Sequence, residues 1–208
     1  MTQTPFRVVV CGAGRMGVCI AQTLAADPRF AVTLAAQDAE SLRAPAAQGL
    51  DTAALTGPFR EALGRLLAGA DAVILADSTA IAAEVAALAV ARGCHYLDIV
   101  ESPASALAVA DVAASVGLSG AGLSGVGPLG GDAACLAPAC GLAPGYVTAL
   151  AGAMLDRAGP KAAITVHVGV LPAIRVNRLG YGDIWGIDGL LSEYTAPCLA
   201  IRGGALCE

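Results

Sequence analysis

Three glycines directly follow a short valine-rich run near the start of the chain. The run from Arg7 to Cys11 leads into Gly12, Gly14 and Gly17. In a phosphate-binding turn of this pattern the first glycine makes the tight turn, the second lets the backbone approach a pyrophosphate, and the third lets the next helix pack on the strand. The pattern predicts a dinucleotide site, and the alternative is a tight turn that merely requires glycine. The expected cofactor contacts are Gly12, Ala13, Gly14, Arg15, Met16 and Gly17.

A carboxylate lies where a ribose partner is expected. Asp38 comes 21 positions after Gly17, at the end of a second predicted strand. An acidic group there accepts hydrogen bonds from the ribose hydroxyls and repels a 2′-phosphate, which slightly favours NAD. Asp38 is equally well placed to cap a helix that begins at Ala39. Because Gln37 is also placed to face the ribose, NADP remains an alternative cofactor.

Small polar residues end another predicted strand. Asp77, Ser78 and Thr79 follow the run from Ala72 to Ala76, and in a fold of this kind they lie over the cofactor. Their alternative role is to end the strand and cap the next helix.

Candidate proton-moving groups follow a fourth run, from His95 to Val100. Strand alternation places Tyr96 and Asp98 on one face. Hydride transfer at an amine carbon needs a nearby group to move a proton, so Asp98, Tyr96 and Glu101 are the candidate catalytic residues. The alternatives are a half-buried tyrosine and carboxylates that cap backbone groups.

The elements that position these residues alternate between strand and helix. This rhythm predicts an α/β fold, a doubly wound parallel sheet whose ligands bind at the carboxyl ends of the strands. The predicted strands are Arg7 to Cys11, Phe30 to Ala36, Leu50 to Thr52, Ala72 to Ala76 and His95 to Val100. The predicted helices are Arg15 to Ala26, Ala39 to Ala47, Phe59 to Ala68, Ala80 to Arg92 and Pro103 to Val116.

The pattern changes after Val116. Residues 1–120 form the predicted dinucleotide-binding domain, residues 117–131 a glycine-rich connection, and residues 132–208 part of a second, α+β domain. In the second domain we expect an apolar helix from Gly145 to Asp156 and a strand from Ala163 to Val170.

Composition excludes several classes of protein. A net charge of −5 and a pI of about 4.9 argue against nucleic-acid binding. The seven cysteines have no C-x-x-C pair and only two histidines accompany them, so no metal site is expected. No apolar run is long enough to span a membrane, and no signal peptide is evident. We expect a soluble, cytoplasmic protein with reduced cysteines.

The chain resembles a family of oxidoreductases over residues 6–208. The block C-G-L-A-P-G at Cys140 to Gly145 carries most of this resemblance. It is joined by Y-L-D-I at Tyr96 to Ile99, V-G-V-L-P at Val168 to Pro172, and W-G-I-D-G-L-L-S-E-Y at Trp185 to Tyr194. Together with the glycine pattern, these blocks resemble saccharopine dehydrogenase-like oxidoreductases of the lysine 6-dehydrogenase or carboxynorspermidine dehydrogenase type.

The resemblance implies a Rossmann domain followed by a catalytic and dimerisation domain. It implies an NAD(P)-dependent enzyme that acts on the C–N bond of an amino acid or related amine, as a homo-oligomer through the second domain. Further cofactor contacts would come from Gly141, Leu142 and Pro144. The candidate substrate contacts are Arg175, Asn177 and Trp185.

The length of the second domain sets the competing hypothesis. Relatives continue well beyond the position of Glu208, so the resemblance implies a C-terminally truncated chain, or a sheet that another subunit covers. The alternative function is a catalytically silent nucleotide-binding or interaction module.

Overall fold

The computed structural model describes residues 4–117, 134–159, 162–169, 174, 178, 195, 200–203 and 205–207. The chain divides into two units, Met1–Val166 and His167–Glu208.

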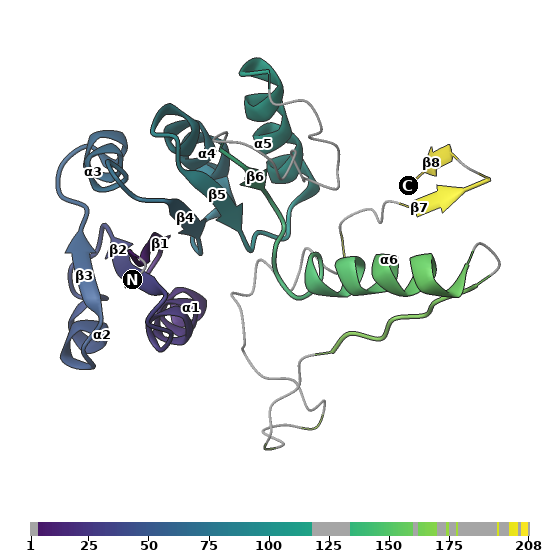
Figure 1. The fold of residues 1–208 in the computed structure, drawn as a ribbon, viewed down its shortest axis with the longest axis horizontal. Coiled ribbons are helices and arrows are strands. Elements are labelled where there is room, and N and C mark those ends of the chain that lie inside the picture. The colour runs from purple at the N-terminus through teal and green to yellow at the C-terminus, as the bar shows by residue number, and fades with distance from the viewer. Residues whose placement is uncertain are drawn as a thin grey trace. The chain divides into compact units, whose positions relative to one another are not determined.

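A six-stranded parallel sheet forms the centre of the first unit. Its strands lie in the order β3-β2-β1-β4-β5-β6 (Figure 1). This order, with its crossover from β3 back past β1 to β4, is that of a doubly wound dinucleotide-binding sheet, so the predicted fold class is confirmed. The strands are β1 (Phe6–Cys11), β2 (Phe30–Ala36), β3 (Asp51–Ala54), β4 (Ala72–Leu75), β5 (His95–Asp98) and β6 (Leu136–Ala137).

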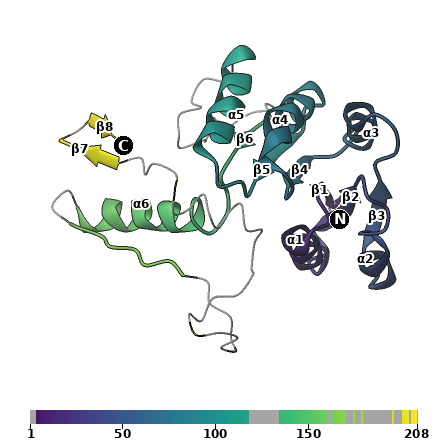
Figure 2. The same cartoon turned by 180° about the vertical axis from the view of Figure 1, so that it is seen from behind.

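Helices cover both faces of this sheet. Figures 1 and 2 show α1 and α2 on one side, and α3, α4 and α5 on the other. The helices of this layer structure are α1 (Arg15–Ala25), α2 (Arg43–Ala47), α3 (Phe59–Leu66), α4 (Ala82–Ala91) and α5 (Pro103–Ser115). A short 3₁₀ turn, η1 (Thr79–Ile81), precedes α4. The helix α6 (Tyr146–Ala158) follows β6.

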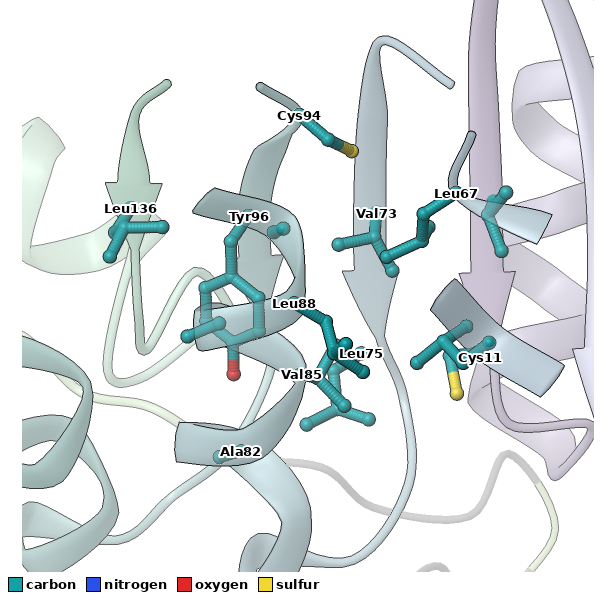
Figure 3. Close-up of a cluster of buried hydrophobic side chains, with 14 of the residues drawn as sticks. Cys11, Leu67, Val73, Leu75, Ala82, Val85, Leu88, Cys94, Tyr96 and Leu136 are labelled. Carbon is teal, nitrogen blue, oxygen red and sulfur yellow. The ribbon is translucent and has the colours of Figure 1, made fainter. Parts of the chain in front are cut away.

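Alternation along the strands builds two separate cores. Val8 and Val10 of β1 face α1, whereas Val9 and Cys11 face the layer of α3, α4 and α5. Figure 3 shows the second core, where the ring of Tyr96 packs among aliphatic side chains from β4 and α4. Burial, with a smaller contribution from the Asp77 carboxylate, raises the pKa of the Cys11 thiol to about 12. Cys11 therefore acts as a small apolar residue of the core.

Most element predictions are confirmed, with boundary shifts of a few residues. The helix predicted from Ala39 begins only at Arg43, because the Asp38 carboxylate holds the preceding residues in a turn. The helix predicted from Gly145 begins at Tyr146 and continues to Ala158.

Two differences concern strands. The strand β6 was not predicted, since two residues carry no periodicity. The strand predicted from Ala163 to Val170 is wrong over its described part, residues 163–169, which have no regular structure. A strand needs a hydrogen-bonded neighbour, and none pairs with this segment among the described residues.

The second unit contains one described hairpin. Its antiparallel strands are β7 (Ala200–Arg202) and β8 (Ala205–Cys207). The domain boundaries predicted from the sequence remain predictions, and the glycine-rich connection lies outside the described residues from position 118 on.

Candidate functional site

The candidate site lies at the carboxyl edge of the parallel sheet, where five segments that carry predicted residues emerge. Because all six strands run in one direction, the turns that follow them emerge at one edge. The turns that carry candidate residues are 12–17 after β1, 37–41 after β2, 76–79 after β4, 99–102 after β5 and 138–145 after β6.

Two glycines of the first turn are required by the packing of the protein itself. Gly12 has a φ of 116°, and a Cβ atom there would lie 2.4 Å from the carbonyl oxygen of Ala76. A Cβ atom on Gly17 would lie 1.8 Å from the carbonyl oxygen of Gly12. The first glycine lets the turn pass against the end of β4, and the third lets α1 start directly over the turn.

The middle glycine is not explained by the fold. Gly14 has a φ of −71° and a ψ of 177°, a conformation open to any residue, and a Cβ atom there would meet no atom within 4 Å. Gly14 is also the residue before α1, whose first turn holds no acidic side chain. The first N–H groups of a helix have no partner within the helix and attract anions. The open space beside Gly14 therefore suits a phosphate group.

A groove of about 390 Å³ extends from this turn between α1 and the β2–α2 region. Arg15 and Ser41 supply polar groups at its lining, and the Gln22 side-chain amide donates to the Gln48 Oε1 at 2.7 Å along the same lining. The cation of Arg15 gives the groove a positive group near the glycine turn. The lining residues are Ala13, Gly14, Arg15, Val18, Cys19, Gln22, Ser41, Ala44, Pro45 and Gln48.

Asp38 caps the turn that precedes α2. Its carboxylate accepts hydrogen bonds from the backbone N–H groups of Glu40 at 3.0 Å and Ser41 at 3.2 Å. The side chain is exposed, and the Ser41 hydroxyl donates to the Asp38 carbonyl at 2.7 Å. Asp38 therefore bonds a turn and does not cap a helix that begins at Ala39, since α2 begins at Arg43 after Leu42, which makes no side-chain cap. The remaining lone pairs of an exposed carboxylate still leave it able to accept from a ribose hydroxyl.

The residues after β4 also cap their own segment. Ser78 is the residue before η1, and its hydroxyl accepts from the backbone N–H of Ala80 at 3.3 Å. The Asp77 carboxylate accepts from the Ser78 N–H at 2.6 Å, and the Thr79 carbonyl accepts from the Ser105 hydroxyl at 3.4 Å. Asp77, Ser78 and Thr79 are exposed. The Cβ of Asp77 lies 3.1 Å from the position that a Cβ on Gly12 would take, so this segment adjoins the glycine turn.

The three candidate catalytic residues after β5 divide into a buried pair and an exposed residue. The Tyr96 hydroxyl donates to the Asp98 Oδ2 at 2.6 Å, and the two side chains are 0% and 1% exposed. Burial and then the hydrogen bond to Asp98 raise the pKa of Tyr96, so its hydroxyl stays protonated at neutral pH. Glu101 is exposed. The shared face predicted for Tyr96 and Asp98 is present, but it is a core face.

The block after β6 forms a tight turn that leads into α6. Gly141 and Gly145 pair in an isolated bridge, and the Gly141 carbonyl accepts from the Tyr146 N–H at 2.9 Å. A Cβ on Gly145, whose φ is 128°, would lie 2.3 Å from the Gly141 carbonyl oxygen. Leu142 and Pro144 are exposed on this turn. The predicted cofactor contacts of this block therefore lie at the same sheet edge as the glycine turn.

The predicted substrate contacts Arg175, Asn177 and Trp185 lie outside the described residues. Within the described part of the chain, no group of three or more His, Cys, Asp and Glu side chains could hold a metal ion. No helix among those same residues is both long and apolar enough to cross a membrane.

Sequence reasoning missed three residues, Ser41 and Gln48 at the groove and Ala139 beside Asp98. Ser41 and Gln48 line the groove from the turns that flank α2, and single polar residues in turns give no pattern that sets them apart. Ala139 donates its backbone N–H to the Asp98 carboxylate at 2.8 Å across 41 positions of sequence. No sequence signal could have found a contact between a side chain and a distant backbone group.

The profile of one protein family matches residues 8–117, more than half of the chain. That family is described as the saccharopine dehydrogenase NADP binding domain. The matched region runs from β1 to the end of α5 and so includes the glycine turn, Asp38 and the Tyr96–Asp98 pair.

Solved structures of dehydrogenases and reductases resemble this fold. Apo saccharopine dehydrogenase (L-Glu forming) from Saccharomyces cerevisiae is 22% identical, with a TM-score of 0.58 over 73% of this chain and 31% of that one. GenD2 from gentamicin A biosynthesis, solved with NAD, is 24% identical, with a TM-score of 0.46 over 66% of this chain and 35% of that one. Biliverdin reductase from Synechocystis sp. PCC 6803, solved with biliverdin and NADP+, is 16% identical, with a TM-score of 0.46 over 65% and 38%.

The first similarity supports the fold, and the other two are too weak to carry an argument. The chain spans about a third of the length of these three proteins, at 31%, 35% and 38%.

Proposed function

The chain belongs to the saccharopine dehydrogenase NADP-binding domain family, and from that premise we propose that it is an NAD(P)-dependent oxidoreductase acting on the C–N bond of an amino acid or related amine. Membership of this family gives the chain an NAD(P)-binding domain homologous to dehydrogenases. The reaction, the substrate and the choice between NAD and NADP are the proposal.

Gly14 is the observation that carries the proposal. Gly12 and Gly17 are required by contacts within the protein, whereas Gly14 lies in open space with an ordinary backbone conformation. Glycine at such a position costs backbone entropy on folding without a packing benefit. A ligand that must approach the backbone closely, such as a pyrophosphate, supplies the missing reason.

The dinucleotide, when bound, supplies a hydride acceptor or donor at its nicotinamide ring. In the proposed binding mode the backbone N–H groups at the start of α1 hold the pyrophosphate, and the groove beside Arg15 receives the adenosine end. The segments after β4 and β6 then flank the nicotinamide end. Removal of hydride from an amine carbon leaves an imine and releases a proton, and the exposed Glu101 carboxylate is the proposed group that takes it.

Two side chains act in opposite directions on the choice of cofactor. The Asp38 carboxylate repels a 2′-phosphate, whereas the Arg15 guanidinium in the groove attracts one. We propose that NAD and NADP both bind, with a slight preference for NAD. Arg175, Asn177 and Trp185 are proposed as the substrate contacts, on the family resemblance of their sequence block.

A second function is favoured by one specific observation. Tyr96 and Asp98 are buried and bonded to each other, which removes two of the three candidate proton carriers from contact with a substrate. The second proposal is therefore a catalytically silent nucleotide-binding or interaction module.

Two measurements separate these functions. Isothermal titration with NADH and NADPH tests the cofactor site, and absence of binding at millimolar concentrations would refute both the oxidoreductase and the nucleotide-binding module. A screen of nicotinamide absorbance with lysine, saccharopine and related diamines tests turnover. Reduction of NAD or NADP with one of these amines supports the oxidoreductase, and binding without turnover across the panel supports the silent module.

We further propose a cytoplasmic homo-oligomer. The six described cysteines are all free thiols, as in a reducing compartment. Exposed apolar side chains on α6, among them Tyr146 and Leu150, support association through that segment, because contiguous apolar surface favours burial against a partner. Size-exclusion chromatography with light scattering would test the oligomer, and a monomer at all concentrations would contradict it.

A further inference from the structure

Asp98 occupies an unusual position for a carboxylate. It is 1% exposed and lies at the end of β5, inside the core that contains Tyr96. Figure 3 shows the Tyr96 ring packed in that core, with its hydroxyl directed toward the carboxyl ends of the strands. An ionised group so deeply buried is costly unless its lone pairs are satisfied. The partners of this carboxylate therefore indicate why it is there.

Both carboxylate oxygens are occupied by hydrogen bonds. The Oδ2 atom accepts from the Tyr96 hydroxyl at 2.6 Å, and the Oδ1 atom accepts from the backbone N–H groups of Val100 at 3.0 Å and Ala139 at 2.8 Å. The Asp98 backbone carbonyl also accepts from the Cys140 N–H at 2.7 Å. Among the described residues, no Lys, Arg or His forms an ion pair with Asp98.

These bonds join two segments that are distant in sequence. Val100 belongs to the turn after β5, whereas Ala139 and Cys140 precede the Gly141–Gly145 turn after β6. The direct pairing of β5 with β6 covers only two residue pairs, Tyr96 with Leu136 and Leu97 with Ala137. The contacts of Asp98 therefore continue the connection between β5 and β6 beyond the end of the sheet. We call this group of residues, Tyr96, Asp98, Val100, Ala139 and Cys140, the Asp98 clamp.

The Asp98 clamp sets the position of the turn after β6. Cys140 leads directly into Gly141, where a Cβ atom would lie 3.8 Å from the Ile99 carbonyl oxygen, so the two turns are in close contact. The Gly141 carbonyl in turn accepts from the Tyr146 N–H at the start of α6. The hydrogen bonds of Asp98 thus hold the short segment 139–141, which continues directly into the turn that carries the exposed Leu142 and Pro144.

We infer that Asp98 is a positioning residue, which holds the Gly141–Gly145 turn against the end of β5 and so shapes the nicotinamide end of the cofactor site. This inference rests on the proposed dinucleotide binding. It assigns Asp98 and Tyr96 a role different from proton transfer, because neither side chain reaches solvent and both oxygens of the carboxylate are already bonded. Glu101 remains the candidate for proton transfer after β5.

The test compares two ligands that share an adenosine end. ADP-ribose reaches the glycine turn and the groove, whereas NADH also places its nicotinamide by the turn after β6. In D98A the loss of the shared acceptor leaves two backbone N–H groups unpaired, and we expect the NADH Kd to rise about tenfold while the ADP-ribose Kd stays within about twofold. D98N keeps an oxygen that can accept from both N–H groups, so its NADH Kd should stay within about threefold of the wild-type value. D111A, which removes an exposed carboxylate on α5, is the matched control.

Hydrogen exchange provides a readout that does not depend on any ligand. In D98A, exchange in a peptide that covers residues 134–145 should accelerate, while a peptide that covers β1 and the glycine turn should stay as in the wild type. Equal NADH affinity in D98A and the wild type would overturn the inference, as would a D98N variant that loses NADH binding as fully as D98A. A wild-type chain that binds neither ligand would refute the proposed function, and the exchange comparison would then decide separately whether Asp98 holds the turn.

Discussion

The turn after β1 and the turns after β5 and β6 lie at one edge of the same sheet, but the first is shaped by the absence of side chains and the others by one buried side chain. In the turn after β1, Gly12 and Gly17 have no side chain, so main-chain segments can contact each other there, and Gly14 leaves a space open to solvent. The turns after β5 and β6 are held by a buried side chain, since the Asp98 carboxylate accepts hydrogen bonds from three groups in two segments that are distant in sequence. The glycine turn is thus a surface that is open to a ligand, whereas the Asp98 clamp fixes the position of a neighbouring surface.

The two regions therefore respond differently to substitution. In the glycine turn, an added side chain should lower the stability of the fold at Gly12 and the affinity for the ligand at Gly14. In the Asp98 clamp, loss of a polar group should destabilise the protein, because it leaves buried partners without a hydrogen bond.

Gly12→Ala should have the largest effect. The φ of 116° is strained for an L-residue, and the new Cβ would lie 2.4 Å from the Ala76 carbonyl oxygen. We expect the free energy of unfolding to fall by about 3 kcal/mol or more, with loss of nucleotide binding. Urea denaturation followed by circular dichroism measures this change.

Gly49→Ala provides the matched control for that substitution. Gly49 also has a positive φ, of 88°, but a Cβ atom there would meet nothing within 4 Å. Its loss should be smaller, about 1 kcal/mol, from backbone strain alone. Equal losses in the two variants would show that the contact with Ala76 is not the reason for glycine at position 12.

Tyr96→Phe should destabilise the fold by about 2 kcal/mol, the range for a hydrogen bond to a charged group. The change removes the hydroxyl that donates to the Asp98 Oδ2, and it leaves that oxygen without a partner among its described neighbours. Thermal and urea unfolding measure the effect. Tyr146→Phe is the control, because that side chain is 64% exposed, and it should be nearly neutral. A neutral Tyr96→Phe would mean that the buried hydroxyl contributes nothing to the stability of the Asp98 clamp.

Gly14→Ala should separate ligand binding from stability. No atom lies within 4 Å of the added methyl group, so the unfolding free energy should stay unchanged or rise slightly. The methyl group would occupy the space proposed for the pyrophosphate, and we expect the NADH Kd to rise about tenfold, or ~1.4 kcal/mol. Calorimetric titration beside thermal unfolding gives both values. If the variant binds NADH as tightly as the wild type, Gly14 no longer supports the proposed function.

Asp38→Asn should have the smallest effect, on the ratio of two affinities. The Glu40 and Ser41 N–H groups bond to different oxygens of Asp38, so the neutral amide keeps an acceptor for one of them, and it no longer repels a 2′-phosphate. The preference should move toward NADPH by about threefold, as expected for one exposed charge. Parallel titrations with NADH and NADPH at low and high salt measure the ratio. An unchanged ratio would show that Asp38 caps the turn and has no part in cofactor choice.

The sequence predicted the glycine turn well and the end of β5 less well, for a physical reason. Gly12, Gly14 and Gly17 act through local backbone geometry at fixed spacing, and that spacing is visible in one sequence. The strands up to β5 were found because alternation and valine-rich runs report burial directly. Tyr96 and Asp98 were correctly placed on one face, but whether that face met solvent or core depended on α4 and β6, which pack against it.

The remaining features depend on contacts between distant segments. The strand β6 exists because Leu136 and Ala137 find β5, and neither residue carries a pattern of its own. The bond from the Ala139 N–H to Asp98 spans 41 positions and has no signature in residue type. The late start of α2 at Arg43 is instead a local effect, because the Asp38 carboxylate accepts from nearby N–H groups and holds them in a turn. The sequence allowed Asp38 to contact a ribose or to cap a helix, and it gave no means to choose between the two roles.

Hydrogen–deuterium exchange on the wild-type chain, with and without saturating NADH or NADPH, tests the central claim most directly. The claim is that a dinucleotide binds across both regions, with its pyrophosphate at the glycine turn and its nicotinamide beside the turn after β6. We predict slower exchange at the backbone N–H groups of residues 14–18 and, with less protection, of residues 139–146. Binding that leaves residues 14–18 unprotected would contradict the account, because the open space beside Gly14 would then have no ligand to explain it.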